Sequence, residues 1–380
     1  MNQDHHRDRV LLLAVLSLLV LGSLMIYSAS AFWSADNNND YSLILKKHLM
    51  RVAAGLMVMF AVSRIDYHVY RRWAPHVLVI MGIFLVAVLA TPRFRGSSRA
   101  FAFPGGSFHP AEYMKLIMVL YLGSVLARGV ELEKFGNKKI MVHFAVILGI
   151  TGLVLVEPDL GTAAVIFLVG LVMLELAGTP RGTLFKIVLS LSPVVFLGMS
   201  ANHYQRDRII DFVRAKMHLA PLPYQIRHSL IALANGGVLG SGYGEGMSKK
   251  LYLPEPFSDF ILSTLGEEFG FVGICVLFMI LGLVLWRGTQ IALRAPDRYG
   301  FLLAGGITSL LMVNSLINAA VAMYLLPTTG LPFPFISYGG SSLFMYMAGM
   351  GILLNISGKT VATYHQFTTD RGRIRWPDIR

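Results

Sequence analysis

The sequence has few charged residues and almost no cysteine. Charged side chains make up 14% of its 380 residues, little more than half of the roughly 25% found in soluble domains. This shortage argues against a soluble globular enzyme, a disordered chain and a long coiled coil. Because Cys275 is the only cysteine, an intramolecular disulfide and a cysteine-based metal site are also excluded.

Long apolar runs take the place of the missing charge. A bilayer core about 30 Å thick needs roughly 20 apolar residues per helix, whereas a membrane β-barrel would show alternating patterns of about ten residues, which are missing here. The sequence therefore predicts an all-α integral membrane protein, a bundle of ten transmembrane helices. The predicted spans are 10–30, 49–63, 74–90, 110–127, 140–156, 160–177, 184–199, 258–286, 300–326 and 338–356.

The basic residues give the expected orientation. The net charge of +12 would suggest nucleic acid in a soluble protein, but here the charges lie between apolar runs, so we expect no nucleic-acid partner. Short basic connections face the cytoplasm in membrane proteins. This rule places both termini in the cytoplasm and the connections 157–159 and 327–337, which lack Lys and Arg, on the outer side. The basic connections are 64–73, 128–139, 178–183 and 287–299.

Three other segments need interpretation. The apolar run 10–26 is longer than a usual signal-peptide core, so we expect a retained helix. Residues 200–257 form a large extracytoplasmic loop before the eighth helix. Segments 209–219 and 224–234 of this loop suit helices in the membrane interface, or a loop folded on itself with a solvated basic face. Residues 1–356 then form one membrane domain, and the polar stretch 357–380 is predicted to be a flexible cytoplasmic tail.

Ionisable groups in or next to membrane helices are costly, so each marks a candidate site. Glu112 and Lys115 are three residues apart and share a helix face, as a functional pair or as a structural ion pair. Asp159 lies in the tight outer turn between two spans, where it could also cap the following helix.

A further acidic cluster begins where the large loop enters the eighth span. Glu255, Ser258 and Asp259 lie at this join, and the alternative for Asp259 is again a helix cap. Glu267 and Glu268 lie deeper in the same span. The Pro- and Gly-rich turn 327–342 is predicted to be a shaped re-entrant loop, because such backbone needs protein cover at membrane depth. The glycine-rich stretch 240–246 is only a weak phosphate-binding signal.

Together these segments resemble the SEDS family (shape, elongation, division and sporulation) of FtsW, RodA and SpoVE. The resemblance covers about residues 10–356. The family's Pro-Ser-Glu-x-x-Lys corresponds to residues 110–115, its Pro-Asp-x-Gly-Thr to 158–162, its Leu-Pro-Glu-x-x-Thr-Asp-Phe-Ile to 253–261 and its Ile-Ser-Tyr-Gly-Gly-Ser-Ser to 336–342. The chain departs from these motifs at Ala111, at His109, where Gln is common, and at Ser258, which keeps the hydroxyl of the usual Thr.

The resemblance implies a peptidoglycan glycosyltransferase that polymerises lipid II at the outer face of the bacterial inner membrane. It implies a class B penicillin-binding protein as partner, together with other divisome proteins, and motifs closer to FtsW or SpoVE favour a septal role over a RodA-like elongation role. We expect Asp259 to be catalytic, and Glu112, Lys115, Asp159, Glu255 and Ser258 to bind substrate. No cofactor is predicted with certainty, and a divalent cation is possible.

The residues fit this chemistry independently of the resemblance. A pyrophosphate leaving group needs cations, which Lys115 and the basic outer loop offer, and an attacking sugar hydroxyl needs a general base, which a carboxylate supplies. Inversion in a single displacement needs only one such carboxylate. The alternatives are a flippase for the same lipid, which buried Glu267 and Glu268 would suit, and a non-catalytic scaffold.

Overall fold

The computed structural model describes residues 8–38, 40–91, 99–103, 106–128, 137–186, 188–189, 203–247 and 257–369. The described part is almost entirely helical. Its elements are α1 (Arg9–Asn38), α2 (Leu43–Arg64), α3 (Tyr67–Leu89), β1 (Phe101–Phe103), β2 (Gly106–Phe108), α4 (Pro110–Leu126), α6 (Asn137–Val156), α7 (Leu160–Leu176), α9 (His203–Lys216), α10 (Tyr224–Gly236), α11 (Ile261–Leu293), α12 (Arg298–Ala322) and α13 (Gly340–Thr369).

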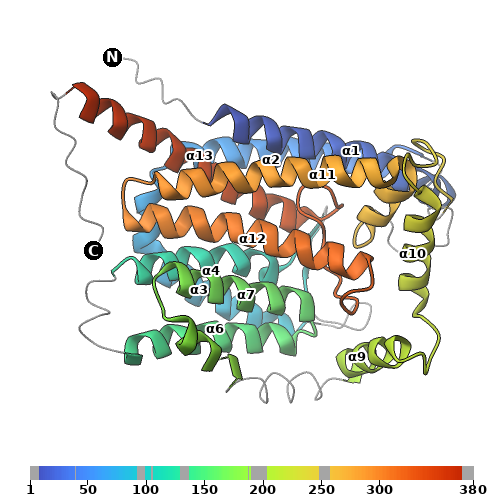
Figure 1. The fold of residues 1–380 in the computed structure, drawn as a ribbon, viewed down its shortest axis with the longest axis horizontal. Coiled ribbons are helices and arrows are strands. Elements are labelled where there is room, and N and C mark those ends of the chain that lie inside the picture. Colours follow the sequence, from blue (N-terminus) through green and yellow to red (C-terminus); the bar gives the residue numbers. More distant parts are fainter. Residues whose placement is uncertain are drawn as a thin grey trace.

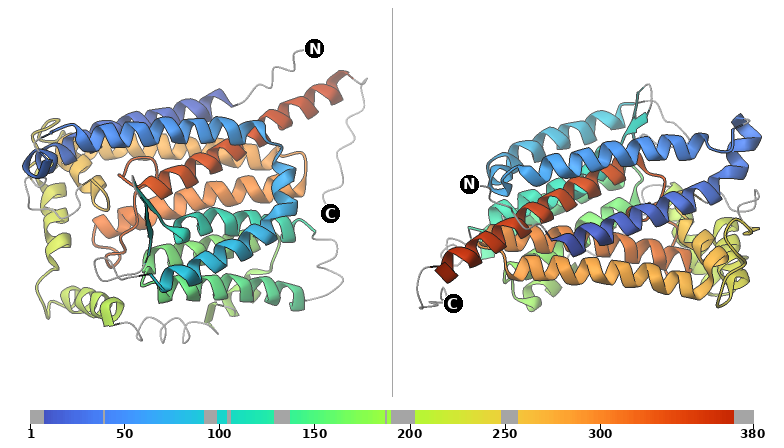
Figure 2. Two further views of the ribbon diagram at one scale, coloured as in Figure 1. Left: turned by 180° about the vertical axis from the view of Figure 1, so that it is seen from behind. Right: turned by 90° about the horizontal axis from the view of Figure 1, so that it is seen from above.

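The long helices form one bundle with roughly parallel axes (Figure 1). Helix α12 is central, because it packs against α4, α7, α11 and α13. Helix α13 packs closely along α2, and α1 packs on α2 and α11. Helix α10 lies across one end of the bundle, roughly perpendicular to the long helices (Figure 1). Views from behind and from above show the short β1–β2 hairpin near this same end (Figure 2).

Nine of the ten predicted spans coincide with described helices, and 184–199 falls largely outside the described residues. Within the described chain, five helices are long and apolar enough to cross a membrane, namely α1, α3, α11, α12 and α13, and α6 and α7 contain shorter apolar stretches. The helical membrane fold is therefore confirmed, whereas the count of ten stays a prediction. Helices α9 and α10 overlap the segments 209–219 and 224–234 that the sequence suggested as helices, and their place in the membrane interface stays a prediction. Helix α13 continues to Thr369, so residues 357–369, predicted as tail, extend a helix that no proline interrupts.

Ion pairs tie the start of α1 to the opposite end of the bundle from α10. Asp8 pairs with Arg287 of α11 at 2.5 Å, and its backbone N–H donates to Ser357 of α13 at 3.2 Å. The first and last described helices therefore meet on one side, as the charge pattern predicted. Asp66, at the start of α3, pairs with Lys359 on this side too. These charges pair with one another, which limits the cost of placing them beside an apolar bundle.

A kink interrupts α11 at Gly270, where φ is +65°. The glycine-rich segment after α10 replaces the hydrogen bonds that the kink breaks. Ser241 and Gly242 donate to the carbonyls of Glu267 and Glu268 at 2.9 and 3.1 Å, and Phe271 and Val272 donate to the carbonyls of residues 237 and 238 at 2.9 and 3.1 Å. These bonds attach the segment 237–242 to α11, the helix that begins just after Asp259. Gly240 thus serves close backbone packing, because a Cβ at this position would lie 2.2 Å from the Glu268 carbonyl oxygen.

We predict that Gly270→Ala destabilises the protein by about 1–3 kcal/mol, because a side chain is strained at positive φ and would meet the backbone of Gly240 at 2.4 Å. The measurement is the thermal midpoint of the purified protein in detergent. Gly282→Ala, on the same helix with no atom within 4 Å of the added Cβ, is the matched control and should be neutral or slightly stabilising. Equal midpoints for the two variants would show that the close packing of Gly270 against the segment 237–242 contributes nothing to stability.

Candidate functional site

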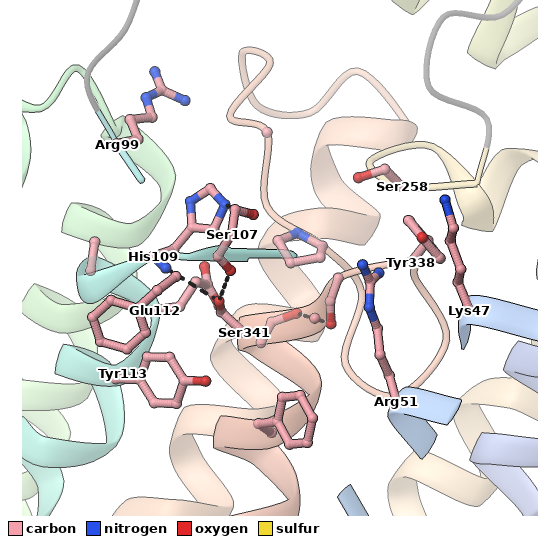
Figure 3. Close-up of a pocket in the computed structure, with 18 of the residues that line it drawn as sticks. Lys47, Arg51, Arg99, Ser107, His109, Glu112, Tyr113, Ser258, Tyr338 and Ser341 are labelled. Carbon is pink, nitrogen blue, oxygen red and sulfur yellow. Dashed lines mark hydrogen bonds between the residues drawn. The ribbon is translucent and has the colours of Figure 1, made fainter. Parts of the chain in front are cut away.

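A cavity of about 1040 Å³, whose lining includes several charged side chains, opens at the end of the bundle that carries the hairpin. Its walls come from the N-terminal half of α2, the first turn of α4, the hairpin, the turn before α7, the turn before α11, and the loop into α13 with the first turns of that helix. Among the predicted site residues, it brings together Glu112, Asp159, Ser258 and Asp259. These residues are far apart in the sequence, so their convergence on one cavity supports a shared site. Figure 3 shows this cavity.

Glu112 lies in the first turn of α4, which Pro110 starts at a position where a missing N–H costs nothing. Its carboxylate reaches the cavity and pairs with Lys115 at 2.9 Å. Lys115 is fully buried below the cavity wall, where Nζ also donates to Asn314 Oδ1 at 3.2 Å. The ammonium lies 5.7 Å from the ring centre of Tyr346. Lys115 is therefore placed to hold Glu112, and it does not line the cavity.

Asp159 has two roles in the structure. Its Oδ1 accepts the N–H of Thr162 at 3.0 Å and caps α7, as the simpler interpretation proposed. The same side chain also lines the cavity. Capping fixes the carboxylate, so one residue can serve both purposes.

Asp259 lies in the turn before α11. The helix begins at Ile261 after Phe260 as its N-cap, so the alternative in which Asp259 caps α11 is wrong. Ser258 Oγ donates to Asp259 Oδ1 at 3.0 Å, and Asn318 Nδ2 donates to the Asp259 carbonyl at 3.0 Å. Ser337 Oγ donates to the Ser258 carbonyl at 2.5 Å. Asp259 is thus held from its side chain and from its backbone.

The loop 327–337 packs into the bundle, as its prolines and glycines predicted. Phe333 and Phe335 are fully buried. Two amides of α12 satisfy its backbone, since Asn314 Nδ2 donates to the Pro332 carbonyl at 2.8 Å and Asn318 Nδ2 donates to the Leu331 carbonyl at 2.6 Å. The loop can lie at this depth because its carbonyls are bonded within the protein.

Three cations of the cavity escaped the sequence analysis: Lys47 and Arg51 of α2, and Arg99 before β1. His109, before α4, was noted only as a departure from the family motif and also lines the cavity. The Arg51 guanidinium lies 4.5 Å from the ring centre of Tyr338, and Arg99 Nε donates to the Glu157 carbonyl at 3.1 Å. A usable signal was present, because Lys47 and Arg51 are basic residues at the outer end of a predicted span, against the usual charge rule. The short β1–β2 hairpin, which lines the cavity next to Arg99, has no sequence pattern that would have predicted its place in the site.

Other candidates lie elsewhere. Glu255 is outside the described residues. Glu267 and Glu268 are buried away from the cavity. Glu267 Oε1 accepts the N–H of Met247 at 3.0 Å, and Ser28 Oγ donates to Glu268 Oε1 at 2.5 Å. Among the described residues, no three His, Cys, Asp or Glu side chains form a metal-binding group, and the possible divalent cation stays a prediction.

Glu157 is a fully buried carboxyl behind the cavity wall, in the turn between α6 and α7. Neither of its carboxyl oxygens has a hydrogen-bond partner among the described residues. Burial raises the pKa of Glu157 to about 8, with a further rise from Asp159 and an opposing effect of Arg99. Burial also lowers the pKa of His109, which Glu112 and Asp159 oppose. Glu157 is therefore neutral at pH 7.

Comparison with known proteins shows one consistent family. The sequence profile of the FtsW, RodA and SpoVE family, described as "Cell cycle protein", matches residues 9–361. The probable peptidoglycan glycosyltransferase FtsW of Trichlorobacter lovleyi is 36% identical over 353 residues, which cover 92% of this chain and 93% of the relative. Stage V sporulation protein E of Bacillus subtilis is 35% identical, with coverage of 92% and 96%. Peptidoglycan glycosyltransferase MrdB of Escherichia coli is 34% identical, with coverage of 89% and 92%.

Two solved structures share the fold. One comes from a study titled "Structural coordination of polymerization and crosslinking by a peptidoglycan synthase complex"; its chain is 25% identical, with a TM-score of 0.74 over 93% of this chain and 98% of that one. The other is rod shape determining protein RodA of Thermus thermophilus, which is 24% identical, with a TM-score of 0.68 over 93% and 97%. The arrangement of helices around the cavity is thus that of known proteins.

We predict that Glu157→Gln stabilises the protein more at pH 8 than at pH 5. The folded protein keeps the proton of Glu157 up to about pH 8, whereas an unfolded carboxyl loses it near its ordinary pKa of 4.5. Wild-type stability therefore falls as the pH rises between these values, and the amide removes this loss. Thermal midpoints across pH 5–9 measure the difference, with Glu245→Gln, an exposed carboxylate, as the control. A difference that does not change with pH would contradict the neutral state of Glu157.

Proposed function

The chain belongs to the FtsW, RodA and SpoVE family, and from this premise we propose that it is a peptidoglycan glycosyltransferase that polymerises lipid II at the outer face of the bacterial inner membrane. One observation carries the proposal. A single cavity at the predicted outer end holds three carboxylates and several cations, among them Asp259, Lys47 and Arg51. A transfer between sugar pyrophosphates needs these two kinds of group.

Asp259 is the proposed general base. It takes the proton of the attacking sugar hydroxyl as the new glycosidic bond forms at the anomeric carbon of the donor. The bond from that carbon to the pyrophosphate oxygen breaks, and its electron pair leaves with the pyrophosphate. Cations of the cavity stabilise the charge that develops there. One carboxylate suffices, because a single displacement inverts the configuration.

The remaining site residues position the reacting groups. Ser258 donates to Asp259 and helps to fix the direction of its carboxylate. Glu112 faces the cavity as a hydrogen-bond acceptor for sugar hydroxyls, and Lys115 holds its carboxylate in place through their ion pair. Lys115 therefore acts through Glu112, in place of the direct contact with pyrophosphate that the sequence suggested. Asp159 contributes a second fixed carboxylate to the wall.

We further propose a septal role and a class B penicillin-binding protein as partner. Relatives named FtsW and a sporulation relative support the septal role, as do the sequence motifs. The study title of the similar solved structure, which joins polymerisation to crosslinking, supports the partner. Depletion of the protein should then leave filamentous cells, whereas loss of an elongation enzyme should leave rounded ones.

Asp259→Asn should polymerise purified lipid II at least ~10²-fold more slowly than wild type, the usual contribution of a general base. The amide keeps the shape of the side chain and the hydrogen bond from Ser258, so the variant should fold and still bind lipid II. Asp211→Asn, an exposed carboxylate on α9 outside the cavity, is the matched control. The measurement is glycan polymer formed in detergent, with and without the partner.

The same assay tests the competing functions. A flippase forms no polymer in detergent, because flipping needs two compartments. A well-folded Asp259→Asn protein that polymerises at the wild-type rate would refute the catalytic role of Asp259. Wild-type protein that binds lipid II but never polymerises it, even with the partner present, would refute the proposed function itself.

The partner's transmembrane helix should dock on α11 and the exposed edge of α12. The small and polar residues Asn314, Ser315 and Ala319 of α12 are buried inside the bundle and offer no surface for docking. Helix α11 instead exposes a row of apolar side chains, among them Phe271 and Met279. A photocrosslinker at Met279 should label a co-expressed partner. One at Ile83, an equally exposed position on α3, should not, and labelling from Ile83 alone would place the partner elsewhere.

A further inference from the structure

Asp259 lines a second, smaller cavity as well as the large one. This small cavity has a volume of about 30 Å³ and lies between the turn before α11, the loop 328–331, α12 and the two outer-loop helices α9 and α10. Gly330 also lines both cavities, and a Cβ added to it would lie 3.5 Å from Asp259 Oδ2. The proposed base thus borders two spaces, and the outer-loop helices line the smaller of them.

The size and the lining of the small cavity suit a single water molecule. One water occupies about 30 Å³ in the liquid and needs two to four polar partners when it is buried. The cavity offers the polar side chains of Asp259, Asn318, Arg208 and Gln225. These four groups are enough to satisfy one water.

Asn318 gives independent evidence for a bound donor. Its amide nitrogen already donates to the carbonyls of Asp259 and Leu331 at 3.0 and 2.6 Å. Its Oδ1 is buried and has no hydrogen-bond partner among the described residues, although the side chain is almost fully buried. Buried polar atoms are normally hydrogen-bonded to protein or to ordered water. A water in the small cavity would supply the donor that Asn318 Oδ1 needs.

The outer-loop helices are held against the bundle at this point. On α9, the ammonium of Lys216 lies 4.3 Å from the ring centre of Tyr324, which follows the end of α12. On α10, Ser229 Oγ donates to the carbonyl of Ala322, the last residue of α12, at 2.7 Å. Both helices are therefore fixed relative to α12, the helix that carries Asn318.

Arg208 is the cation of the small cavity. It lies half-buried on α9, and its Nη1 donates to the Thr328 carbonyl at 3.1 Å. A guanidinium carries five N–H donors in a fixed plane, so one group can hold the loop and bind a water at the same time. Arg208 lines the small cavity and lies outside the lining of the large one. Its geometry therefore favours an effect on Asp259 over a contact with substrate in the large cavity.

We propose that the small cavity binds one water molecule that connects the outer loop to Asp259. The water donates to Asn318 Oδ1 and to the carboxylate of Asp259, and it accepts N–H bonds from Arg208 and Gln225. Because Ser258 donates to Asp259 Oδ1 from another direction, the carboxylate is held on two sides. Arg208 thus acts through the water as a positioning residue for the base. The inference rests on the proposed glycosyltransferase function, in which the direction of this carboxylate determines the rate.

Steady-state kinetics on purified lipid II test the positioning role. Arg208→Gln should lower kcat about 10-fold and leave KM close to that of wild type, because a misplaced base slows the chemical step, by up to ~10²-fold for a shift of about 1 Å. Arg208→Lys should recover part of the rate, since an ammonium can still donate to the water. Arg214→Gln, an exposed cation on the same helix outside both cavities, is the matched control.

Gln225→Met distinguishes a shared water from two unrelated structural effects. Gln225 and Arg208 lie on different helices, so the losses in kcat should add if each residue only supports its own helix. If both bind one water, the double variant should polymerise at nearly the rate of Arg208→Gln alone. Thermal midpoints identify the folded variants. Additive losses, an unchanged kcat in folded Arg208→Gln, or a raised KM with unchanged kcat would overturn the positioning role.

A crystal structure of the full chain, at a resolution that shows ordered waters, tests the site without any activity. A water should lie within hydrogen-bond distance of Asn318 Oδ1 and of the Asp259 carboxylate. A dry cavity would overturn the inference while leaving glycan synthesis intact. Wild-type protein that holds this water but never polymerises lipid II would instead refute the proposed function and leave the water site standing.

Discussion

A charged cavity at the end of an apolar bundle is the constraint on which this structure depends. An unpaired charge in such surroundings costs several kcal/mol, so each buried charge needs a partner within the protein. The ion pair of Glu112 with Lys115 meets this need at the floor of the cavity, where Lys115 is fully buried. Glu157, which lacks such a partner, is kept neutral by its raised pKa. The cavity can hold several ionisable groups because the surrounding helices pair them or neutralise them.

Irregular backbone near the membrane has a similar requirement, because its polar carbonyl groups need hydrogen-bond donors within the protein. The turn before α11 and the loop 327–337 both place cavity residues, and side chains of α12 satisfy carbonyls in each of them. Asn318 on α12 joins them, since its amide donates to Asp259 and to Leu331. The central helix α12 thus carries the polar side chains that hold the proposed base. Asn314 and Asn318 therefore point into the bundle and do not contribute to a surface on which a partner helix could dock.

Much of the fold followed from the sequence, because apolar run length and basic loops report directly on membrane spans. Nine helices of the bundle, the helical segments of α9 and α10 and the buried loop 327–337 were predictable in this way. The continuation of α13 to Thr369 was not, since polarity alone does not end a helix. Within the site, acidic residues stood out against apolar neighbours. Arg99 did not, because positive charge in a connection is ordinary until the fold brings it to the cavity, and the signal of Lys47 and Arg51 was only their position at the wrong end of a predicted span.

The central claim is that this cavity holds the head group of lipid II, and photolabelling tests it most directly. A lipid II analogue with a diazirine beside its pyrophosphate would be activated on the purified, folded protein, and the labelled peptides would be identified by mass spectrometry. We predict labels within residues 47–54, 99–112 and 330–342, which contain residues that line the cavity. Labels confined to 203–247, or to the connections on the opposite side of the membrane, would contradict the account.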